Sequence, residues 1–441
     1  MIRNLILAFS LLPFILSGQV PNTFSDSEKI YGLSTIWKEA EFNFAYFEKI
    51  GTVKWDSLYK SMINRVLETK NDYEYYRELS FFMSFLKDGH TGVGRYPNVD
   101  RYTTIYKGYL IEFGRIGEKV IVTRINYSKK DSIPLGSELL EVNGLAPDNY
   151  LAKFVTPYIS ASTDKSRDEK AVYNILDGLP GMKYTIKIKT PANDIKTIQL
   201  VHGDIGEKFP PATIPETVKR EAVEFKWFDN KIAYLAINSF SDSTILASFT
   251  KLLPEIAKAD KLIIDIRENT GGNSEIGFEI LKYLTDDKIL NIHSSKTRKH
   301  IPRANREEAF VCVADSYEPY VNNHTDKSIV IPTLVLTGGK TISAAEDFLV
   351  PIKKIGHMRT MGETTSGSTG SPYSFKLPGS WAYVCSLQCC YPDGSEYVGV
   401  GIKPDIEVKR TIRGIINRKD EVLDQALADL NGRSSKKFKA L

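Results

Sequence analysis

The alternation of strand-like and helical segments in the C-terminal half is the feature that most limits the fold of this chain. The runs KIAYLAINSF, KLIIDI and SIVIPTLVLTG are rich in apolar residues and typical of strands in a largely buried sheet. Helical spacing of apolar residues occurs at 245–258, 274–284 and 344–355. Such alternation predicts an α/β layer structure, and β-rich hairpins are expected from Met358 to Val408.

Two other kinds of pattern precede this region. Apolar and aromatic residues at three- and four-residue spacings predict helices from Ser27 to Phe85. Short β-rich runs separated by Gly, Pro and Asp predict a small β domain from Tyr106 to Val201, with a helical stretch near Asp168 to Leu176. The predicted divisions are a helical N-terminal domain at 19–103, a small β domain at 104–205, a Pro-bearing linker at 206–220 and an α/β core at 221–432.

The chain ends carry signals of a different kind. Arg3, an apolar stretch from Leu5 to Leu16 and the small residues Ser17 and Gly18 predict a secretory signal peptide at 1–18. The apolar stretch is shorter than the ~20 residues of a spanning helix, so we expect an exported chain, periplasmic or secreted, without a membrane span. An uncleaved anchor is the alternative. Residues 433–441 form a basic tail.

Composition excludes several classes of function. The 441 residues include 58 Lys and Arg against 54 Asp and Glu, a formal net charge of +4 without a long basic stripe, so nucleic-acid binding is not expected. Four cysteines are too few for a disulfide scaffold, although one disulfide is possible. No CxxC pair and no His cluster with metal-ligand spacing occurs, so we expect neither metal nor cofactor.

Ser343 is the first candidate for chemistry. In LVLTGGKTISAAEDFL it follows an apolar strand and a glycine pair and stands directly before a helical stretch. A helix N-terminus favours the negative charge that develops on an attacked carbonyl, which suits a nucleophile. The same residue, with Glu346, also fits the S-x-x-E capping box, and the segment alone favours the cap.

Three further sites could assist such a serine. Gly271 and Gly272, in KLIIDIRENTGGNS, could present bare backbone N–H groups to a carbonyl, or could serve only a tight turn. His90, in LKDGHTGV, lies at a glycine-containing turn and is a candidate base. Glu396, in DGSEYVGVGIKPDI, is a candidate orienting carboxylate. Taken singly, His90 is more often an ordinary surface residue in a turn, and Glu396 a solvated carboxylate on a strand.

Seven segments taken in order, LKDGHT, SELLEVNG, IAYLAINSF, LIIDIRENTGG, TISAAE, GETTSGSTG and GVGIKPDI, resemble the S41 family of serine peptidases, the C-terminal processing and tricorn-core group. The resemblance spans nearly the whole chain after the signal. It implies a multidomain α/β protein with a helical N-terminal region, a PDZ-like domain at 104–205 and a ClpP/crotonase-like peptidase core.

The resemblance also implies roles for single residues. Ser343 occupies the family's nucleophile position, and the oxyanion hole is implied at the N–H groups of Ala344 and of Gly271 or Gly272. The processing branch uses a lysine as base, but Ser368 stands at that place in GETTSGSTG, so a Ser-Lys dyad is not expected.

The tricorn-like branch uses an N-terminal histidine and a late glutamate, positions that His90 and Glu396 fit. The predicted triad is therefore Ser343, His90 and Glu396. The likeness to a PDZ domain further implies that Gly108, Tyr109, Leu110 and Ile111 form the loop that faces a bound peptide, which would add a strand to the sheet edge.

The predicted function is an exported serine endopeptidase that hydrolyses unfolded or tail-bearing polypeptides through an acyl-enzyme. A non-catalytic ligand- or peptide-binding protein on the same scaffold is the alternative. A peptidase with another base, such as Lys340 or Lys353, is a third possibility that no pattern supports.

Overall fold

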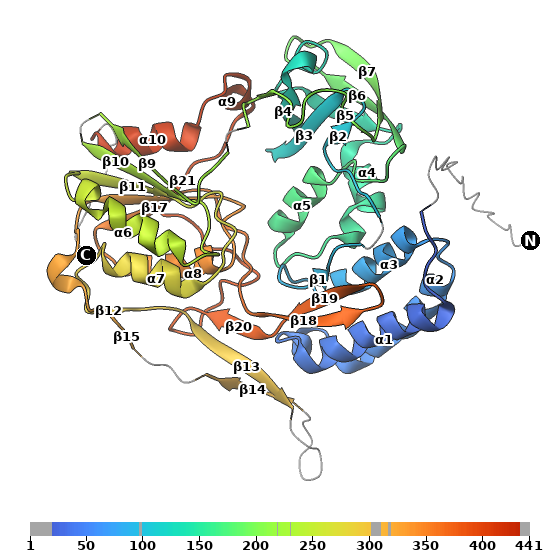
Figure 1. The fold of residues 1–441 in the computed structure, drawn as a ribbon, viewed down its shortest axis with the longest axis horizontal. Coiled ribbons are helices and arrows are strands. Elements are labelled where there is room, and N and C mark those ends of the chain that lie inside the picture. Colours follow the sequence, from blue (N-terminus) through green and yellow to red (C-terminus); the bar gives the residue numbers. More distant parts are fainter. Residues whose placement is uncertain are drawn as a thin grey trace, which may run out of the picture.

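The computed structural model describes residues 20–432 except 97–98, 218, 230, 301–309 and 316–318. The predicted signal peptide and basic tail lie outside the described residues. Three regions are visible in Figure 1: N-terminal helices at the lower right, a small β domain at the upper right and an α/β core on the left. The mixed α/β, multidomain fold class predicted from the sequence is confirmed.

A six-stranded sheet with the order β21-β17-β16-β11-β10-β9 forms the centre of the core. Its strands are β9 (Val223–Phe228), β10 (Ile232–Ile237), β11 (Lys261–Asp265), β16 (Thr333–Thr337), β17 (Met358–Gly362) and β21 (Ile406–Glu407). The strands from β10 to β21 pair in parallel, and only β9 is antiparallel to its neighbour β10. Met358–Gly362 is therefore a parallel strand of this sheet and not part of a hairpin, a correction to the sequence-based prediction.

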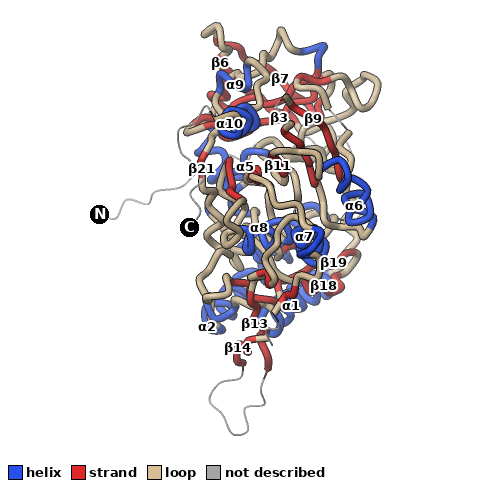
Figure 2. The backbone as a smooth tube through the Cα atoms, turned by 90° about the vertical axis from the view of Figure 1, so that its left-hand side faces the viewer, coloured by secondary structure: helices blue, strands red, loops and turns tan. Residues whose placement is uncertain are grey.

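Helices cover both faces of this sheet, which explains its apolar strands. In β10, Leu235 and Ile237 face a cluster shared with α6 (Thr244–Ile256), α7 (Ser274–Lys282) and α8 (Ala344–Ile352). The alternate residues Tyr234 and Ala236 face a second cluster with α10 (Glu421–Leu430). In the turned view, α10 lies above β11, and α7 and α8 lie below it (Figure 2). The period of two along each strand thus builds two separate apolar layers.

The small β domain has its own core. Its sheet runs in the order β2-β3-β4-β5-β6-β7, and two helices accompany it. The elements are β2 (Ile105–Tyr106), β3 (Tyr109–Ile116), β4 (Lys119–Asn126), β5 (Glu138–Val142), α4 (Pro147–Phe154), η3 (Thr156–Tyr158), α5 (Asp164–Tyr173), β6 (Lys183–Lys189) and β7 (Ile195–Val201). A further strand, β8 (Thr213–Ile214), pairs with β4, so part of the predicted linker belongs to this sheet.

The N-terminal helices are α1 (Asp26–Asn43), α2 (Thr52–Leu67) and α3 (Asp72–Ser84), followed by β1 (Gly92–Val93). Ser25 caps α1 through a complete capping box. The helices pack against a hairpin of the C-terminal part, β18 (Pro372–Leu377) and β19 (Ser380–Cys385), and β1 pairs with β19. One apolar cluster runs through both regions, so the helices and the α/β core share a hydrophobic core.

A second antiparallel sheet extends away from the core at the bottom of Figure 1. It consists of β13 (Ser294–His300), β14 (Phe310–Ala314) and β20 (Leu387–Cys390). The remaining described elements are β12 (Ile289–Leu290), β15 (Tyr320–Val321), α9 (Ile412–Ile416) and the short helices η1 (Phe47–Lys49), η2 (Tyr127–Lys129) and η5 (Thr325–Lys327). All four cysteines are free thiols, and Cys385, Cys389 and Cys390 are buried in or beside these strands.

We predict that Trp55→Ala strongly destabilises the fold, because Trp55 is fully buried and its ring stacks on Phe82 at 4.2 Å between centroids. Truncating such a side chain costs about 3 to 5 kcal/mol of unfolding free energy. Denaturant unfolding followed by circular dichroism measures the loss. Val53→Ala on the same helix is the control, because Val53 is 86% exposed and should change stability by less than about 0.5 kcal/mol.

Candidate active site

Ser343 lies between β16 and α8 with a backbone conformation that few side-chain-bearing residues adopt. Its φ is +63°, in the region that favours glycine. The side chain makes no cap hydrogen bond to the helix, and the carboxylate of Glu346 accepts hydrogen bonds from other residues. The capping-box alternative for Ser343 is therefore wrong, and a strained serine at a strand-to-helix turn is typical of an exposed nucleophile.

Three loops meet around Ser343 because parallel strands end at the same edge of a sheet. These loops follow β11, β16 and β17 and carry Gly271, Ser343 and Ser368, respectively. Gly271 leaves no room for a side chain, since a Cβ there would lie 2.6 Å from the Cβ of Ser343. The N–H of Ser343 donates to the carbonyl of Ser368 at 2.8 Å. The backbone of Ser343 is thus held from both neighbouring loops.

His90 reaches Ser343 from the N-terminal region. Its Nε2 lies 2.9 Å from the hydroxyl oxygen of Ser343. The pairing of β1 with β19 places the preceding turn beside the core, and Thr91 Oγ1 accepts a hydrogen bond from the N–H of Cys385 at 3.0 Å. The structure therefore brings together two of the three residues predicted from the sequence, with the serine positioned to donate its proton to the imidazole.

Ser368 occupies the other side of the imidazole. His90 Nδ1 lies 2.7 Å from its hydroxyl oxygen. In the tautomer that lets Nε2 accept the proton of Ser343, Nδ1 carries a hydrogen and donates it to Ser368. From the sequence, Ser368 is notable only as the residue in place of a lysine. Its contact with His90 joins positions 278 residues apart, which no local pattern reveals.

A buried carboxyl group holds the loop that carries Ser368. Glu346, in the first turn of α8, accepts hydrogen bonds from the N–H groups of Gly367 and Ser368, each at 2.8 Å, and from the hydroxyl of Thr365. Its complete burial raises its pKa to about 8, although these three hydrogen bonds favour the charged form. The helix that begins after Ser343 therefore also positions Ser368, the residue that contacts His90.

Burial sets the protonation of His90. It lowers the pKa of the imidazole below its usual value, against the opposing effect of two nearby carboxylates, Asp88 and Asp347. Asp88 accepts from the N–H of His90 at 2.9 Å and from the hydroxyl of Ser162 at 3.1 Å. Asp347 accepts from Tyr397 at 2.8 Å. The histidine is therefore neutral near pH 7, as a general base requires.

Glu396 does not join this arrangement, which corrects the predicted triad. Its carboxylate is 59% exposed and lies 3.3 Å from the ammonium group of Lys49. The next residue, Tyr397, is fully buried and donates to Asp347, so the chain turns the glutamate outward at this point. The alternative bases also lie elsewhere: Lys340 pairs with Glu268 at 2.9 Å, and Lys353 lies over the ring of Tyr391.

The structure separates the two candidate glycines of the oxyanion hole. The N–H of Gly271 already donates to the side chain of Asn269 at 2.8 Å. No hydrogen bond to a described residue is found for the N–H of Gly272 or of Ala344. Because Gly271 abuts Ser343, the next peptide group lies close to the nucleophile. Gly272 and Ala344 are thus the two donors available to a developing oxyanion.

Three N–H groups of the loop predicted to face a bound peptide are hydrogen-bonded within the protein. The N–H of Gly108 donates to the carbonyl of Ile205 at 3.1 Å, that of Leu110 to the side chain of Asn126 at 3.1 Å, and that of Ile111 to the carbonyl of Thr104 at 2.9 Å. Tyr109 pairs with Tyr106 in the β2–β3 hairpin. These contacts use the N–H groups of Gly108, Leu110 and Ile111 within the protein, and the role of residues 108–111 in facing a bound peptide stays a prediction.

The α/β core with a serine hydroxyl on a buried, neutral histidine defines a serine-type hydrolase. Residues 231–408 match the sequence profile of Peptidase family S41. The carboxy-terminal processing protease CtpB of Bacillus subtilis is 24% identical over 392 residues, which cover 88% of this chain and 70% of that protein.

The carboxyl-terminal-processing protease of a Picosynechococcus strain is 23% identical over 356 residues, covering 80% of this chain and 76% of that protein. The crystal structure of mature CPAF has the same fold, with a TM-score of 0.72 at 15% identity over 93% of this chain and 99% of that one. Residues 231–408 thus form a Peptidase family S41 domain, and the chain is a serine-type peptidase. The predicted family is confirmed, which favours an enzyme over the non-catalytic alternative.

We predict that Ser343→Gly is more stable than Ser343→Ala by about 1 kcal/mol. A residue with a Cβ in such a backbone region costs of order 1 to 3 kcal/mol, which glycine avoids at an entropic cost of about 0.4 to 1 kcal/mol. Thermal unfolding of both variants measures the difference. At Ser243, which also precedes a helix but has a φ of −62°, the gain from glycine over alanine should be smaller, because only the ordinary N-cap preference for glycine remains. Equal unfolding midpoints for the two Ser343 variants would argue against strain.

Proposed function

We propose that this chain is an exported serine endopeptidase that cleaves unfolded or tail-bearing polypeptides through an acyl-enzyme. The observation that carries the proposal is the hydrogen-bonded series Ser343 Oγ, His90 Nε2, His90 Nδ1 and Ser368 Oγ, with contacts of 2.9 and 2.7 Å. Ser343 is the nucleophile, His90 the general base, and Ser368 a positioning residue for the imidazole.

The reaction begins with attack of Ser343 Oγ on a peptide carbonyl while His90 Nε2 takes the hydroxyl proton. The N–H groups of Gly272 and Ala344 donate to the oxyanion of the tetrahedral intermediate, an interaction worth about 3 to 4 kcal/mol in comparable hydrolases. His90 then donates its proton to the leaving amine. Water, activated by the same histidine, hydrolyses the acyl-enzyme and releases the second product.

The charge of the imidazolium is balanced at a distance in this scheme. In the Ser-His-Asp arrangement a carboxylate accepts directly from Nδ1. Here a neutral hydroxyl accepts from Nδ1, and the negative charges of Asp88 and Asp347 stabilise the protonated ring through space. Both carboxylates are themselves held by hydrogen bonds, so they are fixed before the proton moves.

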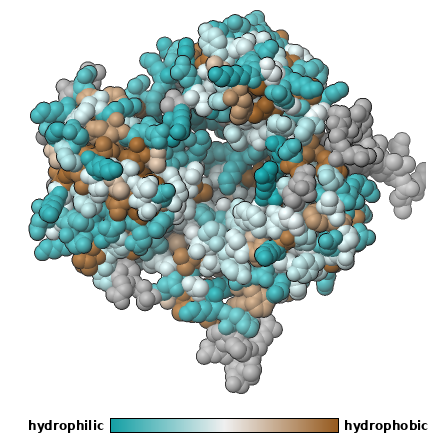
Figure 3. Space-filling view, in the orientation of Figure 1, coloured by the Kyte–Doolittle hydropathy of each residue, from teal (hydrophilic) through white to brown (hydrophobic). Residues whose placement is uncertain are grey.

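The substrate class is supported by the names of the relatives and by the shape of the molecule. Two relatives are carboxy-terminal processing proteases. The face seen in Figure 1 is hollowed between the core and the small β domain, with mostly hydrophilic side chains at its border (Figure 3). A hollow of this kind admits an extended chain more readily than a folded domain.

No helix of the described residues is long and apolar enough to cross a membrane.

We expect Ser343→Ala and His90→Ala each to lower kcat/KM for an unfolded protein substrate by a factor of order 10⁴ or more, because the two groups act as a unit. Hydrolysis of a denatured, fluorescently labelled protein and of a peptide library measures the loss. Thermal unfolding of each variant serves as the folding control. Full activity in a folded Ser343→Ala variant would show that the nucleophile lies elsewhere.

The role of Ser368 is tested by the pH profile. We expect kcat/KM of the wild type to rise along an acid limb whose apparent pKa is below 6.5, since burial lowers the pKa of His90. Ser368→Ala removes an acceptor that favours the imidazolium, so the limb should move to lower pH and kcat should fall about 10- to 100-fold.

Glu396→Gln is the matched control for this experiment. Because Glu396 contacts Lys49 and not the imidazole, the variant should keep the acid limb of the wild type and most of its activity. A displaced limb in Glu396→Gln, with an unchanged limb in Ser368→Ala, would restore the triad predicted from the sequence.

A further inference from the structure

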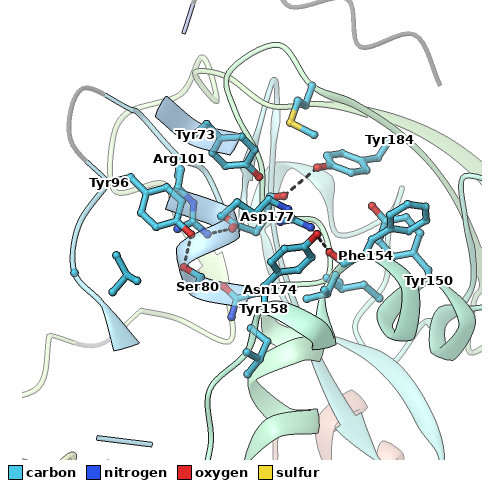
Figure 4. A pocket seen from close by; sticks show the side chains of 17 residues that line it. Tyr73, Ser80, Tyr96, Arg101, Tyr150, Phe154, Tyr158, Asn174, Asp177 and Tyr184 are labelled. Atoms are coloured by element: carbon cyan, nitrogen blue, oxygen red, sulfur yellow. Dashed lines mark hydrogen bonds and ion pairs between the residues drawn. The ribbon is translucent and has the colours of Figure 1, made fainter. Parts of the chain in front are cut away.

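A cavity of about 250 Å³ lies between the N-terminal helices and the small β domain. Tyrosine side chains from α3, the loop after β1, α4, η3 and β6 surround it (Figure 4). These are Tyr73, Tyr96, Tyr150, Tyr158 and Tyr184. The cavity is separate from the predicted peptide loop at 108–111, because none of those four residues lines it.

The charges that line this cavity do not cancel. Arg101 pairs with Asp177, and the link is visible in Figure 4. Arg77, the second guanidinium, donates to the carbonyl of Phe154 and lies over the ring of Tyr158 at 3.6 Å. No carboxylate of the described residues forms an ion pair with Arg77. The cavity therefore carries one half-buried cation without a counter-ion, which favours an anionic ligand.

Two tyrosine hydroxyl groups add uncharged hydrogen-bond donors to the cavity. No hydrogen bond to a described residue is found for the hydroxyl of Tyr73 or of Tyr150, although both rings line the cavity. Burial raises the pKa of Tyr150 to about 12 and also raises that of Tyr73, so both stay protonated at physiological pH. By contrast, Tyr96 pairs with Ser80 at 2.8 Å and Tyr184 with the carbonyl of Asp177 at 3.2 Å.

One guanidinium and two phenols inside a ring of aromatic side chains match a carboxylate attached beside an apolar or aromatic group. We propose that this cavity binds the C-terminal residue of a polypeptide, with Arg77, Tyr73 and Tyr150 on the carboxylate and the tyrosine rings around the terminal side chain. The volume suits one side chain with its carboxylate. An acidic side chain within a peptide offers the same charged group, so the experiment must separate the two sources.

The cavity is connected to the nucleophile by a short strand, and this step rests on the proposed function. Val93 and Gly94 line the cavity, and Gly94 follows His90 by four residues. The strand β1, which contains Val93, pairs with β19. Four residues of extended chain span at most ~13 Å, so we expect a substrate anchored in the cavity to reach Ser343 with a bond within about four residues of its end.

Binding is tested on the Ser343→Ala protein, so that no cleavage interferes. The probe is a decapeptide ending in Phe, labelled at its N-terminus and followed by fluorescence anisotropy, in three forms: free acid, C-terminal amide, and amide with an internal Glu. We expect the free acid to bind at least tenfold more tightly than either amide, and Arg77→Met to remove that preference. Equal binding of acid and amide, or preference for the internal Glu, would overturn the proposal.

Two variants keep this test decisive. Tyr73→Phe removes only one hydroxyl, so it should weaken acid binding severalfold even if Arg77→Met unfolds. Arg115→Met is the matched control, because Arg115 lies on β3 and pairs with Asp168 at 2.7 Å, away from the cavity. If Arg115→Met lost the preference while Arg77→Met kept it, the carboxylate would bind along β3 and the proposal would fail.

Cleavage is measured separately on the wild type by mass spectrometry of the same peptides. We expect the free acid to be cut mainly within about four residues of its end, and the amide more slowly and without that restriction. If the wild type cleaves neither peptide but the Ser343→Ala protein binds the acid through Arg77, the proposed function fails and the cavity assignment stands. Cleavage without any acid preference in either assay would support the proposed function and overturn the cavity assignment.

Discussion

The hydrogen bond from the N–H of Ser343 to the carbonyl of Ser368 is the contact on which the site depends. It joins the loops after β16 and β17 at the point where Ser343 adopts a positive φ. Gly271 closes the other side, because only a residue without a side chain can lie so near Ser343. Glu346 then fixes the backbone of Ser368 from the same helix that Ser343 precedes. The strain at the serine is therefore maintained by contacts on every side.

The small β domain takes part in this arrangement. Ser162, just before α5, donates to Asp88 and accepts from the N–H of Gly89 at 2.9 Å. Thr163 donates to the carbonyl of Ser366 at 3.0 Å, two residues before the partner of the imidazole. One segment of the β domain thus contacts both the loop of the base and the loop that orients it. All three regions of the chain thus contribute contacts around the candidate site, in spite of their separate sheets.

Much of the fold follows from the sequence because the periodic patterns are strong. The helices at 244–256, 274–282 and 344–352 begin within one residue of their predicted starts, since each follows a strand and a turn. Motifs in family order predict Ser343 and His90 as partners, and the structure places them in contact. The prediction for Glu396 fails because a motif does not determine which of two neighbouring residues faces inward, and Tyr397 takes the buried position.

Other parts of the site depend on contacts that no local pattern contains. The choice between Gly271 and Gly272 is made by the side-chain amide of Asn269, and the N–H of Gly108 donates to Ile205, which lies 97 residues further along the chain. Ser368 stands where the family's other branch has its base, yet its meeting with His90 requires the whole tertiary fold.

The shared core of the first helices and the β18–β19 hairpin has a consequence for synthesis. The chain emerges from the ribosome N-terminus first, and domains tend to fold in that order. The helices that lead to His90 lack their packing surface until residues 372–385 have emerged, and the imidazole lacks its partner until Ser368 has. A nascent chain that already contains His90 and Ser343 but not residues 368–385 therefore lacks contacts that hold both side chains in place.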